Sequence, residues 1–118
     1  NVVDDQRGNP TYADDAATAL LHMANQAAQG KAAWGVYHFA GDTAVSRDEF
    51  ARAVLVQAAA QGLLPRVPEV RPVSSRNYPS AAERPADSRL DCRKVQAAFG
   101  IAPSDWRAAL HDLSDYFD

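Results

Sequence analysis

Short extended patterns alternate with helical patterns along the chain, and this alternation limits the possible folds more than any other feature. Val2 and Val3 open an extended segment, and apolar residues at helical spacing then predict a helix over residues 11–29, ended by Gly30. β-Branched and aromatic residues predict a strand over residues 35–40. Such alternation is typical of α/β proteins, in which right-handed crossovers join parallel strands.

The first predicted helix carries its own start signal. Gly8, Asn9 and Pro10 are suited to a turn, Thr11 is suited to the N-cap, and Asp14 stands where a capping box needs its acid. Alanines and leucines form an apolar stripe along this helix, which we expect to be its buried face. The stripe consists of Leu20, Leu21, Ala24, Ala27 and Ala28.

The second predicted helix has a complete start signal. Ser46 and Glu49 match a capping box, and Val45 is placed to pack against Phe50 as a hydrophobic staple. Phe50 also begins the apolar face that we expect this helix to bury. Gly62 is the expected end of the helix, because glycine readily adopts the left-handed conformation of a C-cap.

After this helix the sequence predicts a short extended segment over residues 69–74. Pro72 has no backbone N–H, so the segment is expected at a sheet edge or in a weakly paired strand. Residues 76–88 are rich in polar residues and proline and are expected to form a loop. The chain is thus predicted to contain about four helices and three short strands with parallel pairing.

Two further helices are predicted to close the chain. Asp87 or Ser88 is expected to cap the first of them, and Gly100 to end it. Ser104 is expected to cap the last helix. Apolar residues at helical spacing give this last helix an inner face made of Trp106, Leu110, Leu113 and Phe117.

The composition bounds the class of protein. A chain of 118 residues is long enough for one domain, and 47% hydrophobic residues suit a globular core. A net charge of −3 and scattered basic residues argue against nucleic acid as a partner. Cys92 lies in a helical pattern and is expected to be a buried thiol in a reducing, cytoplasmic setting. The sequence contains no run of about 20 apolar residues, so no segment is expected to span a membrane.

The sequence holds no recognisable catalytic motif. The six glycines never occur at the spacing of a dinucleotide-binding fingerprint. Short-chain reductases need a lysine four residues after a tyrosine, so that the lysine lowers the tyrosine pKa. Here Ala16, Gly41 and Ala82 stand at that spacing, and Tyr116 is too near the end. The three histidines have no ligand partner at helical spacing, so no metal site is predicted.

Three stretches are nevertheless specific in their order and spacing. They are VVDDQRGNPTYADDA at residues 2–16, GVYHFAG with SRDEFA at residues 35–51, and YPSAAERPADSRLD with FGI and Trp106 at residues 78–106. Together they resemble the last third of dTDP-4-dehydrorhamnose reductases, members of the extended short-chain dehydrogenase/reductase superfamily. The resemblance covers nearly the whole chain.

The resemblance implies a role for each part of the chain. In such enzymes an N-terminal Rossmann domain, absent here, holds NADPH and the Tyr/Lys pair, and reduces the dTDP-sugar ketone to dTDP-L-rhamnose for polysaccharide biosynthesis. The chain would then be the C-terminal, substrate-binding portion and inactive alone. Residues 1–45 would include the last elements of the Rossmann layer, and residues 46–118 the substrate-side lobe. The chain opens without Met, which also suggests the middle of a longer protein.

The resemblance also implies site residues. In this family a turn beside the substrate cleft forms part of the pocket wall. The residues that match it here are Gln6, Gly8, Pro10 and Thr11. Arg84 would bind the diphosphate, because Pro85 favours an extended backbone there and a guanidinium matches phosphate bidentately. The alternatives are that the turn is purely structural and that Arg84 pairs with Asp87. Some family members bind Mg²⁺ between subunits, for which Asp14 and Asp115 are candidates.

Two other functions stay open at this point. The parent protein could be a sugar-nucleotide epimerase or dehydratase of the same superfamily. It could also be a non-catalytic, reductase-like regulatory subunit, as in methionine adenosyltransferase. In each case the first helix and the strand at residues 35–40 would lack their sheet. Their apolar faces would need other cover, so we expect a homo-oligomer for the isolated chain.

Overall fold

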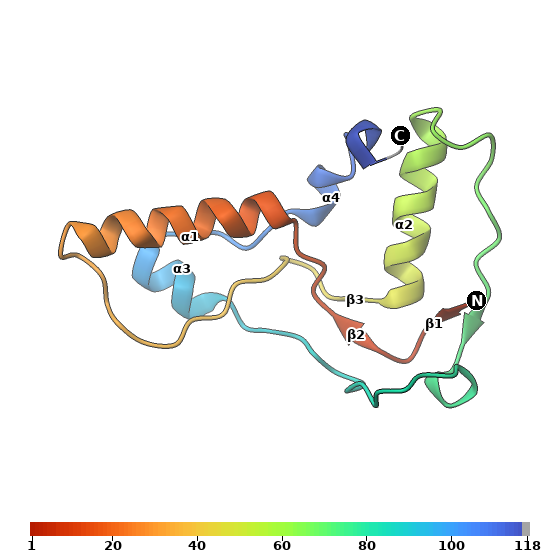
Figure 1. Ribbon diagram of the computed structural model, residues 1–118, viewed down its shortest axis with the longest axis horizontal. Coiled ribbons are helices and arrows are strands. Elements are labelled where there is room, and N and C mark those ends of the chain that lie inside the picture. The colour runs from red at the N-terminus through yellow and green to blue at the C-terminus, as the bar shows by residue number, and fades with distance from the viewer. Residues whose placement is uncertain (117–118) are drawn as a thin grey trace. The chain divides into compact units, whose positions relative to one another are not determined.

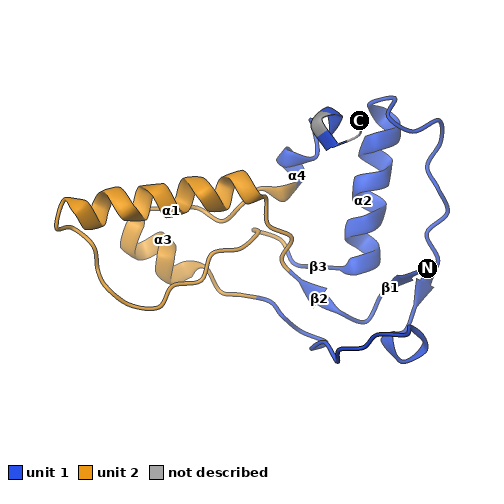
Figure 2. Cartoon of the chain, in the orientation of Figure 1, with its two compact units in different colours: residues 1–8, 44–89, 107–118 blue, residues 9–43, 90–106 orange. Residues whose placement is uncertain are grey.

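The computed structural model describes residues 1–116, without the side chain of Asp115, and divides into two compact units. Unit 1 comprises residues 1–8, 44–89 and the segment from 107, and unit 2 comprises residues 9–43 and 90–106 (Figure 2). Each unit is therefore built from segments that are far apart in the sequence. The expected division near residue 45 stays a prediction.

Unit 1 consists of short strands around one long helix (Figure 1). Its elements are β1 Val2–Val3, β2 Arg7–Gly8, β3 Val45–Ser46, α2 Arg47–Ala60, β4 Pro72–Val73 and the 3₁₀ turns η1 Ser75–Asn77 and η2 Ser114–Tyr116. β1 pairs with β4 in parallel, as expected for an α/β protein, whereas β2 and β3 form an antiparallel pair that the sequence did not predict. No helix of the described residues has the length and apolarity to cross a membrane.

The first residues of the chain connect the other segments of unit 1. The Val2 amide donates to the Arg71 carbonyl at 3.0 Å, and the Asp4 amide donates to the Val73 carbonyl at 3.1 Å. The Arg7 amide donates to the Ala86 carbonyl at 2.8 Å. Residues 2–8 therefore join the segment around β4 to the end of the following loop.

The capping box predicted for α2 is confirmed. The Ser46 hydroxyl accepts from the Glu49 amide at 3.4 Å, and the Glu49 carboxylate accepts from the Ser46 amide at 2.7 Å. The Ser46 hydroxyl also donates to Asp48 at 2.6 Å, and this hydrogen bond lowers the Asp48 pKa more than the nearby Arg52 does. These bonds fix where α2 begins, and the helix ends just before Gly62 as predicted.

The last described segment packs in unit 1. The Gln61 side chain donates to the Leu110 carbonyl at 2.7 Å and accepts from the Leu113 amide at 2.9 Å. Leu110 and Leu113 are both buried, as expected, although α4 (Trp106–Ala109) is a single turn that ends before them. Phe117, the last residue predicted for this inner face, lies outside the described residues.

Unit 2 is built from α1 (Ala13–Ala28) and α3 (Arg93–Phe99), which pack together. Its core contains Cys92, Val95 and Phe99, with Met23 of α1 packed against them. The buried Cys92 thiol, expected from the sequence, donates to the Ala40 carbonyl at 3.8 Å. Burial of these apolar side chains holds the two helices together.

The N-cap predicted for α1 is wrong. Tyr12 is the N-cap and makes no side-chain cap hydrogen bond. The Thr11 hydroxyl donates to the Asn9 carbonyl at 3.0 Å and accepts from the Gly41 amide at 3.1 Å, so it is used by a distant segment. The Asp14 carboxylate accepts from the Tyr12 hydroxyl at 2.7 Å. Tertiary partners thus replace the local cap that the sequence pattern suggested.

The strand predicted for residues 35–40 is also wrong. A strand needs a hydrogen-bonded neighbour, and within the described residues the pairing here is limited to a bridge between Gly41 and Ser104. At that point Gly41 lies so close to Pro10 that an added Cβ would come 1.9 Å from the Pro10 carbonyl oxygen. Glycine is therefore required where these two segments meet.

The apolar stripe predicted for α1 is not its buried face. Leu20 and Leu21 are 67% and 68% exposed, while Ala19 is buried and Met23 packs on the core. Ala19 and Met23 are four residues apart and lie on one side of the helix. α1 therefore has two apolar sides, and Met23 on one of them packs on the core that α3 contributes to.

The cap predicted for the third helix is wrong as well. α3 begins at Arg93, with Cys92 as its N-cap, and ends at a left-handed Gly100 as expected. Asp87 instead accepts several hydrogen bonds from the Arg89 side chain, the shortest at 2.6 Å. Asp91 is bound in the same way by Arg93. Each aspartate is two residues before its arginine and also accepts from that arginine's backbone amide, which for Asp91 is the first amide of α3.

Replacing Ser46 by alanine is expected to destabilise the chain by about 1 kcal/mol, because the Glu49 amide loses its acceptor at the start of α2. The free energy of unfolding from urea denaturation measures this change. Thr18→Ala is the control, since Thr18 is an exposed residue within α1 and alanine has the higher helix propensity. Equal stability of Ser46→Ala and the unaltered chain would contradict the capping box.

The Arg89 side chain is expected to control the titration of Asp87. Its hydrogen bonds lower the Asp87 pKa from 3.8 to about 2, so this pair stabilises the fold above pH 4 and the stabilisation is lost as the pH falls through about 2. In Arg89→Gln the Asp87 pKa should return toward 3.8, as measured by NMR of the carboxyl carbon.

Arg93→Gln is the matched control for this titration. It should raise the pKa of Asp91, which Arg93 likewise lowers to about 2, and should leave Asp87 unchanged. A pKa of Asp87 near 3.8 in the unaltered chain would show that the pair does not form in solution.

Candidate functional site

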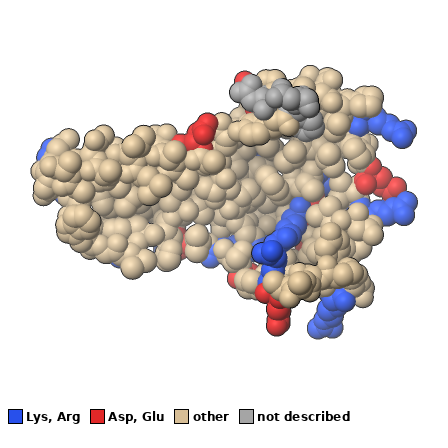
Figure 3. All heavy atoms as spheres, viewed as in Figure 1, with Lys and Arg blue, Asp and Glu red and all other residues tan. Residues whose placement is uncertain are grey.

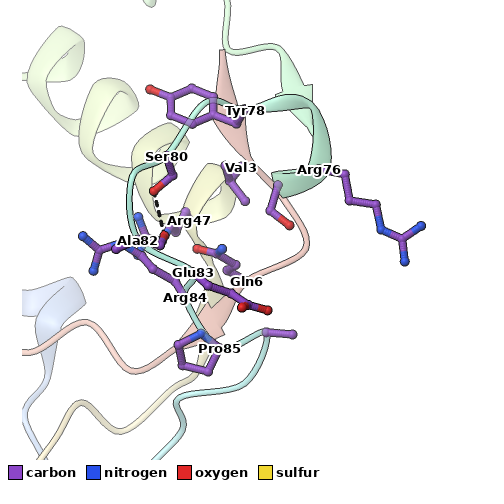
Figure 4. Close-up of a pocket in the computed structure, with 12 residues that line it drawn as sticks. Val3, Gln6, Arg47, Arg76, Tyr78, Ser80, Ala82, Glu83, Arg84 and Pro85 are labelled. Atoms are coloured by element: carbon purple, nitrogen blue, oxygen red, sulfur yellow. Dashed lines mark hydrogen bonds between the residues drawn. The ribbon is translucent and has the colours of Figure 1, made fainter.

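A pocket of about 910 Å³ lies in unit 1 (Figure 4). Its walls come from β1, the first residue of α2, η1 and the loop that follows η1. The lining combines charged, polar and apolar side chains: Val3, Gln6, Arg47, Ser75, Arg76, Tyr78, Ser80, Ala82, Glu83, Arg84, Pro85 and Ala86. A cavity of this size is within the range of small-molecule binding sites.

Asp5 holds one end of the pocket loop. Its carboxylate accepts from the Ser74 hydroxyl at 2.8 Å, and from the amide and hydroxyl of Ser75 at 3.0 and 3.1 Å. The Ser74 hydrogen bond is the largest cause that lowers the pKa of Asp5. Because the carboxylate stays ionised at neutral pH, these bonds keep η1 against the chain that follows β1.

The other end of the loop is also tied to the first residues of the chain. The Arg7 amide donates to Ala86, and the Ser88 amide donates to the Arg7 carbonyl at 2.9 Å. Between the two ends, the Ser80 hydroxyl donates to the Ala82 carbonyl at 2.8 Å (Figure 4). The pocket loop is therefore attached at both ends and braced in the middle, although its side chains are exposed.

Several arginines of unit 1 are paired with acids, whereas the three arginines that line the pocket are not. Figure 3 shows the charged side chains of the visible face gathered mainly over unit 1. Arg7 and Arg52 pair with Glu49 and Asp48 at 3.9 and 3.5 Å. Further pairs are Arg71 with Glu69 and Arg89 with Asp87.

Within residues 1–116, the side chains of Arg47, Arg76 and Arg84 form no ion pair or hydrogen bond. Figure 4 shows Arg76 directed away from the other labelled residues of the pocket. Glu83 supplies the one acidic side chain of the lining, so the pocket carries a positive charge. An arginine without an internal acid is available to bind an external anion.

Two of the five residues expected at a substrate site line this pocket. Gln6 and Arg84 do so, whereas Gly8, Pro10 and Thr11 do not. Gly8 is in β2, opposite Val45, and its Cα lies close enough to Ser88 that an added Cβ would come 2.8 Å from the Ser88 hydroxyl. Pro10 and Thr11 belong to unit 2. The binding roles of all five residues stay predictions.

Arg47 and Tyr78 line the pocket but were not expected there. A signal for Arg47 was available in the sequence, because a capping box at Ser46 makes the next residue the first of a helix. That signal places the backbone of Arg47 but does not reveal which loop faces it. For Tyr78, the sequence signal was its place within the loop motif that includes Arg84.

A metal centre finds no support in the described part of the chain. No group of three or more histidine, cysteine, aspartate or glutamate side chains there is arranged to hold an ion. Asp14, a candidate for Mg²⁺, is hydrogen-bonded to Tyr12. The side chain of Asp115, the other candidate, lies outside the described residues.

Several curated relatives of the chain share one name. A protein named dTDP-4-dehydrorhamnose reductase from Aggregatibacter actinomycetemcomitans is 45% identical over 116 residues, which cover 98% of this chain and 40% of that protein. The reductases of the same name from Mycobacterium tuberculosis and Sinorhizobium fredii are 42% and 35% identical, over 93% and 96% of this chain and 33% and 38% of those proteins. The chain thus spans about two-fifths or less of their length.

Solved structures of reductases have a part that matches the fold of this chain. The dTDP-4-dehydrorhamnose reductase of Bacillus anthracis, solved in complex with NADP, matches with a TM-score of 0.76 at 26% identity, over 98% of this chain and 36% of that one. The Clostridium acetobutylicum orthologue matches with a TM-score of 0.80 over 98% of this chain and 37% of that one; at 23% identity this match concerns the fold alone.

These matches confirm the α/β class and the expected place of the chain in a Rossmann-type reductase fold. The model of one family, described as the RmlD substrate binding domain, matches residues 1–118, the whole length of the sequence. The resemblance noted from three short stretches is thereby confirmed over every part of the chain. We conclude that the chain belongs to the RmlD substrate-binding domain family.

Proposed function

We propose that the chain is the substrate-binding portion of an NADPH-dependent reductase that converts dTDP-4-dehydro-L-rhamnose to dTDP-L-rhamnose. Membership of the RmlD substrate-binding family and the reductase names of the relatives support the reaction class. The observation that carries the proposal for this chain is its pocket, whose lining includes Arg84, a residue without an ion pair among the described residues. A dTDP-sugar offers the diphosphate that such a guanidinium binds well.

The pocket also suits the rest of such a ligand. The amide of Gln6 and the hydroxyl of Ser75 offer donors and acceptors for sugar hydroxyls, and Tyr78 offers an aromatic face that is 46% exposed. Val3 and Pro85 supply apolar contact. A lining of this kind would position a sugar nucleotide without supplying a group that transfers hydride.

We assign NADPH to the remainder of the complete protein, because the sequence lacks a glycine fingerprint and the amide at the start of α1 is already bonded within the chain. A dinucleotide fingerprint would place glycines and free amides at a helix start. At the start of α1, however, the Tyr12 amide donates to Ser104 at 3.1 Å, and the Ser104 hydroxyl donates to Asp15 at 2.6 Å. Cofactor binding and proton delivery to the ketone would therefore be functions of another part of the protein, and the chain alone would be inactive.

Exposed apolar side chains of unit 2 support this division of the protein. Leu20 and Leu21 of α1 are more than two-thirds exposed, and Trp34 and Val36 are 87% and 73% exposed. In the view of Figure 3 the surface of unit 2 is mostly uncharged. Large apolar side chains gathered on one compact unit usually mark a contact surface. We propose that the remainder of the complete protein covers them.

Expressed alone, the chain is expected to self-associate through these side chains. Light scattering at rising protein concentration should show a dimer or larger species. The double substitution Leu20→Ser and Leu21→Ser should shift it toward the monomer, because it removes exposed apolar area without touching the packed side of α1. A monomer at every concentration before substitution would contradict the prediction.

The proposed reaction is tested in the complete protein by following NADPH consumption with dTDP-4-dehydro-L-rhamnose as substrate. Arg84→Gln should raise KM or weaken substrate binding roughly 10- to 100-fold, the usual loss for a charge-assisted hydrogen bond. The rate at saturation should change little, since the diphosphate is remote from the ketone. Arg66→Gln is the matched control, because Arg66 is exposed and lies outside the pocket lining.

The same assay separates the alternatives. Turnover of a sugar nucleotide without net NADPH consumption would indicate an epimerase or dehydratase of the same superfamily. A complete protein that binds dTDP-sugar or NADPH but turns over neither would favour the non-catalytic regulatory subunit. Equal KM values for Arg84→Gln and Arg66→Gln would remove Arg84 from the binding site.

A further inference from the structure

We propose that Arg47 is a second phosphate-binding residue, which acts with Arg84 so that each guanidinium binds one phosphate of a nucleoside diphosphate. The inference rests on the proposed function and names the part of the site that selects a diphosphate over a monophosphate. Arg47 and Arg84 line the same pocket in unit 1 but come from different walls, the start of α2 and the loop after η1.

The position of Arg47 is set by rigid structure. It is the first residue of α2 and directly follows Ser46, whose hydroxyl and amide both take part in the capping box. Ser46 also pairs with Arg7 in the β2–β3 ladder. The Arg47 backbone therefore has little freedom, and the side chain extends from a fixed point into the pocket lining. The fixed backbone limits the space that the guanidinium can reach, and that space includes the pocket.

The acids next to Arg47 are already engaged. Asp48 accepts from Ser46 and pairs with Arg52, and the Glu49 carboxylate accepts from the Ser46 amide. Arg47 is left without an acid among the described residues. A cation at the first position of a helix also opposes the helix dipole, which favours negative charge there. The residue type is thus unfavourable for the helix by itself, and a bound anion removes both disadvantages.

The two other charges of the lining fit the same assignment. Arg76 points away from the labelled group in Figure 4, which leaves Arg47 and Arg84 as the pocket cations. Glu83 repels phosphate, so binding an anion here requires more than one guanidinium to outweigh it. A diphosphate supplies two anionic groups for two arginines, whereas a monophosphate supplies one.

The test is calorimetric titration of the complete protein with dTDP and with dTMP. Arg47→Gln and Arg84→Gln should each weaken dTDP binding roughly tenfold or more. dTMP binding should be weakened by one of these substitutions but not by both, because a single phosphate occupies one of the two positions. Arg47→Lys should retain part of the dTDP affinity, since it keeps the charge but not the bidentate geometry.

Arg66→Gln serves again as the control and should bind both nucleotides as the unaltered protein does. The thermal midpoint of Arg47→Gln should not fall, because the substitution leaves Ser46 and Glu49 in place and removes a cation from the helix start. A lower midpoint would mean that Arg47 is needed for the fold and would overturn its assignment as a free ligand-binding residue.

The outcomes distinguish the two proposals. If the unaltered protein binds dTDP and Arg47→Gln binds it equally well, the assignment of Arg47 fails and the proposed function stands. If both substitutions weaken dTDP and dTMP to the same extent, the assignment of one phosphate to each arginine is overturned. If the unaltered protein does not bind dTDP, the proposed function fails, and the inference about Arg47 fails with it.

Discussion

Unit 1 depends on the hydrogen bonds that the backbone of residues 2–8 makes with segments distant in the sequence. Amides and carbonyls of this short stretch bond to the chain around β4, to β3 and to the end of the pocket loop. Each paired segment is two residues long, so no pair is a stable sheet by itself. The carboxylate of Asp5 adds the bonds to η1 that hold the other end of the loop. A change here would therefore disturb both ends of the pocket loop.

Structural features that depend only on neighbouring residues could be predicted from the sequence. The capping box of Ser46 and Glu49 and the left-handed Gly100 are both present, because each needs only a few adjacent residues. Helix caps whose side chains can also bind distant residues could not be predicted in this way. Thr11 and Asp14 form a sound local cap pattern, yet the Thr11 hydroxyl binds Gly41 from another segment. Asp87 similarly binds Arg89, because an arginine two residues away offers several donors at once.

The error at residues 35–40 has a different cause. The residue types there favour a strand, but a strand exists only where a neighbour supplies hydrogen bonds, and the described residues supply a single bridge at Gly41. The leucines of α1 show the same limit. Leu20 and Leu21 belong to the predicted apolar stripe but are exposed, whereas Ala19 is buried and Met23 packs on the core of unit 2. Periodicity identifies an apolar face without identifying which surface covers it, and α1 has two such faces.

The candidate site shows how far residue chemistry alone can reach. Arg84 could be named as a candidate because Pro85 favours an extended backbone, a guanidinium matches a diphosphate, and the loop belongs to a stretch that resembles the family. Arg47 could not, because an arginine at the start of a helix looks like an ordinary surface residue beside two acids. What separates it from Arg52 is which partner each acid takes, and that depends on Ser46, Arg7 and the strand pairing behind them. Which arginines of the pocket stay without an acid is therefore decided by the pattern of ion pairs in unit 1. Arg47 is left without an acid because Asp48 and Glu49, its neighbours in α2, are already bound to other groups.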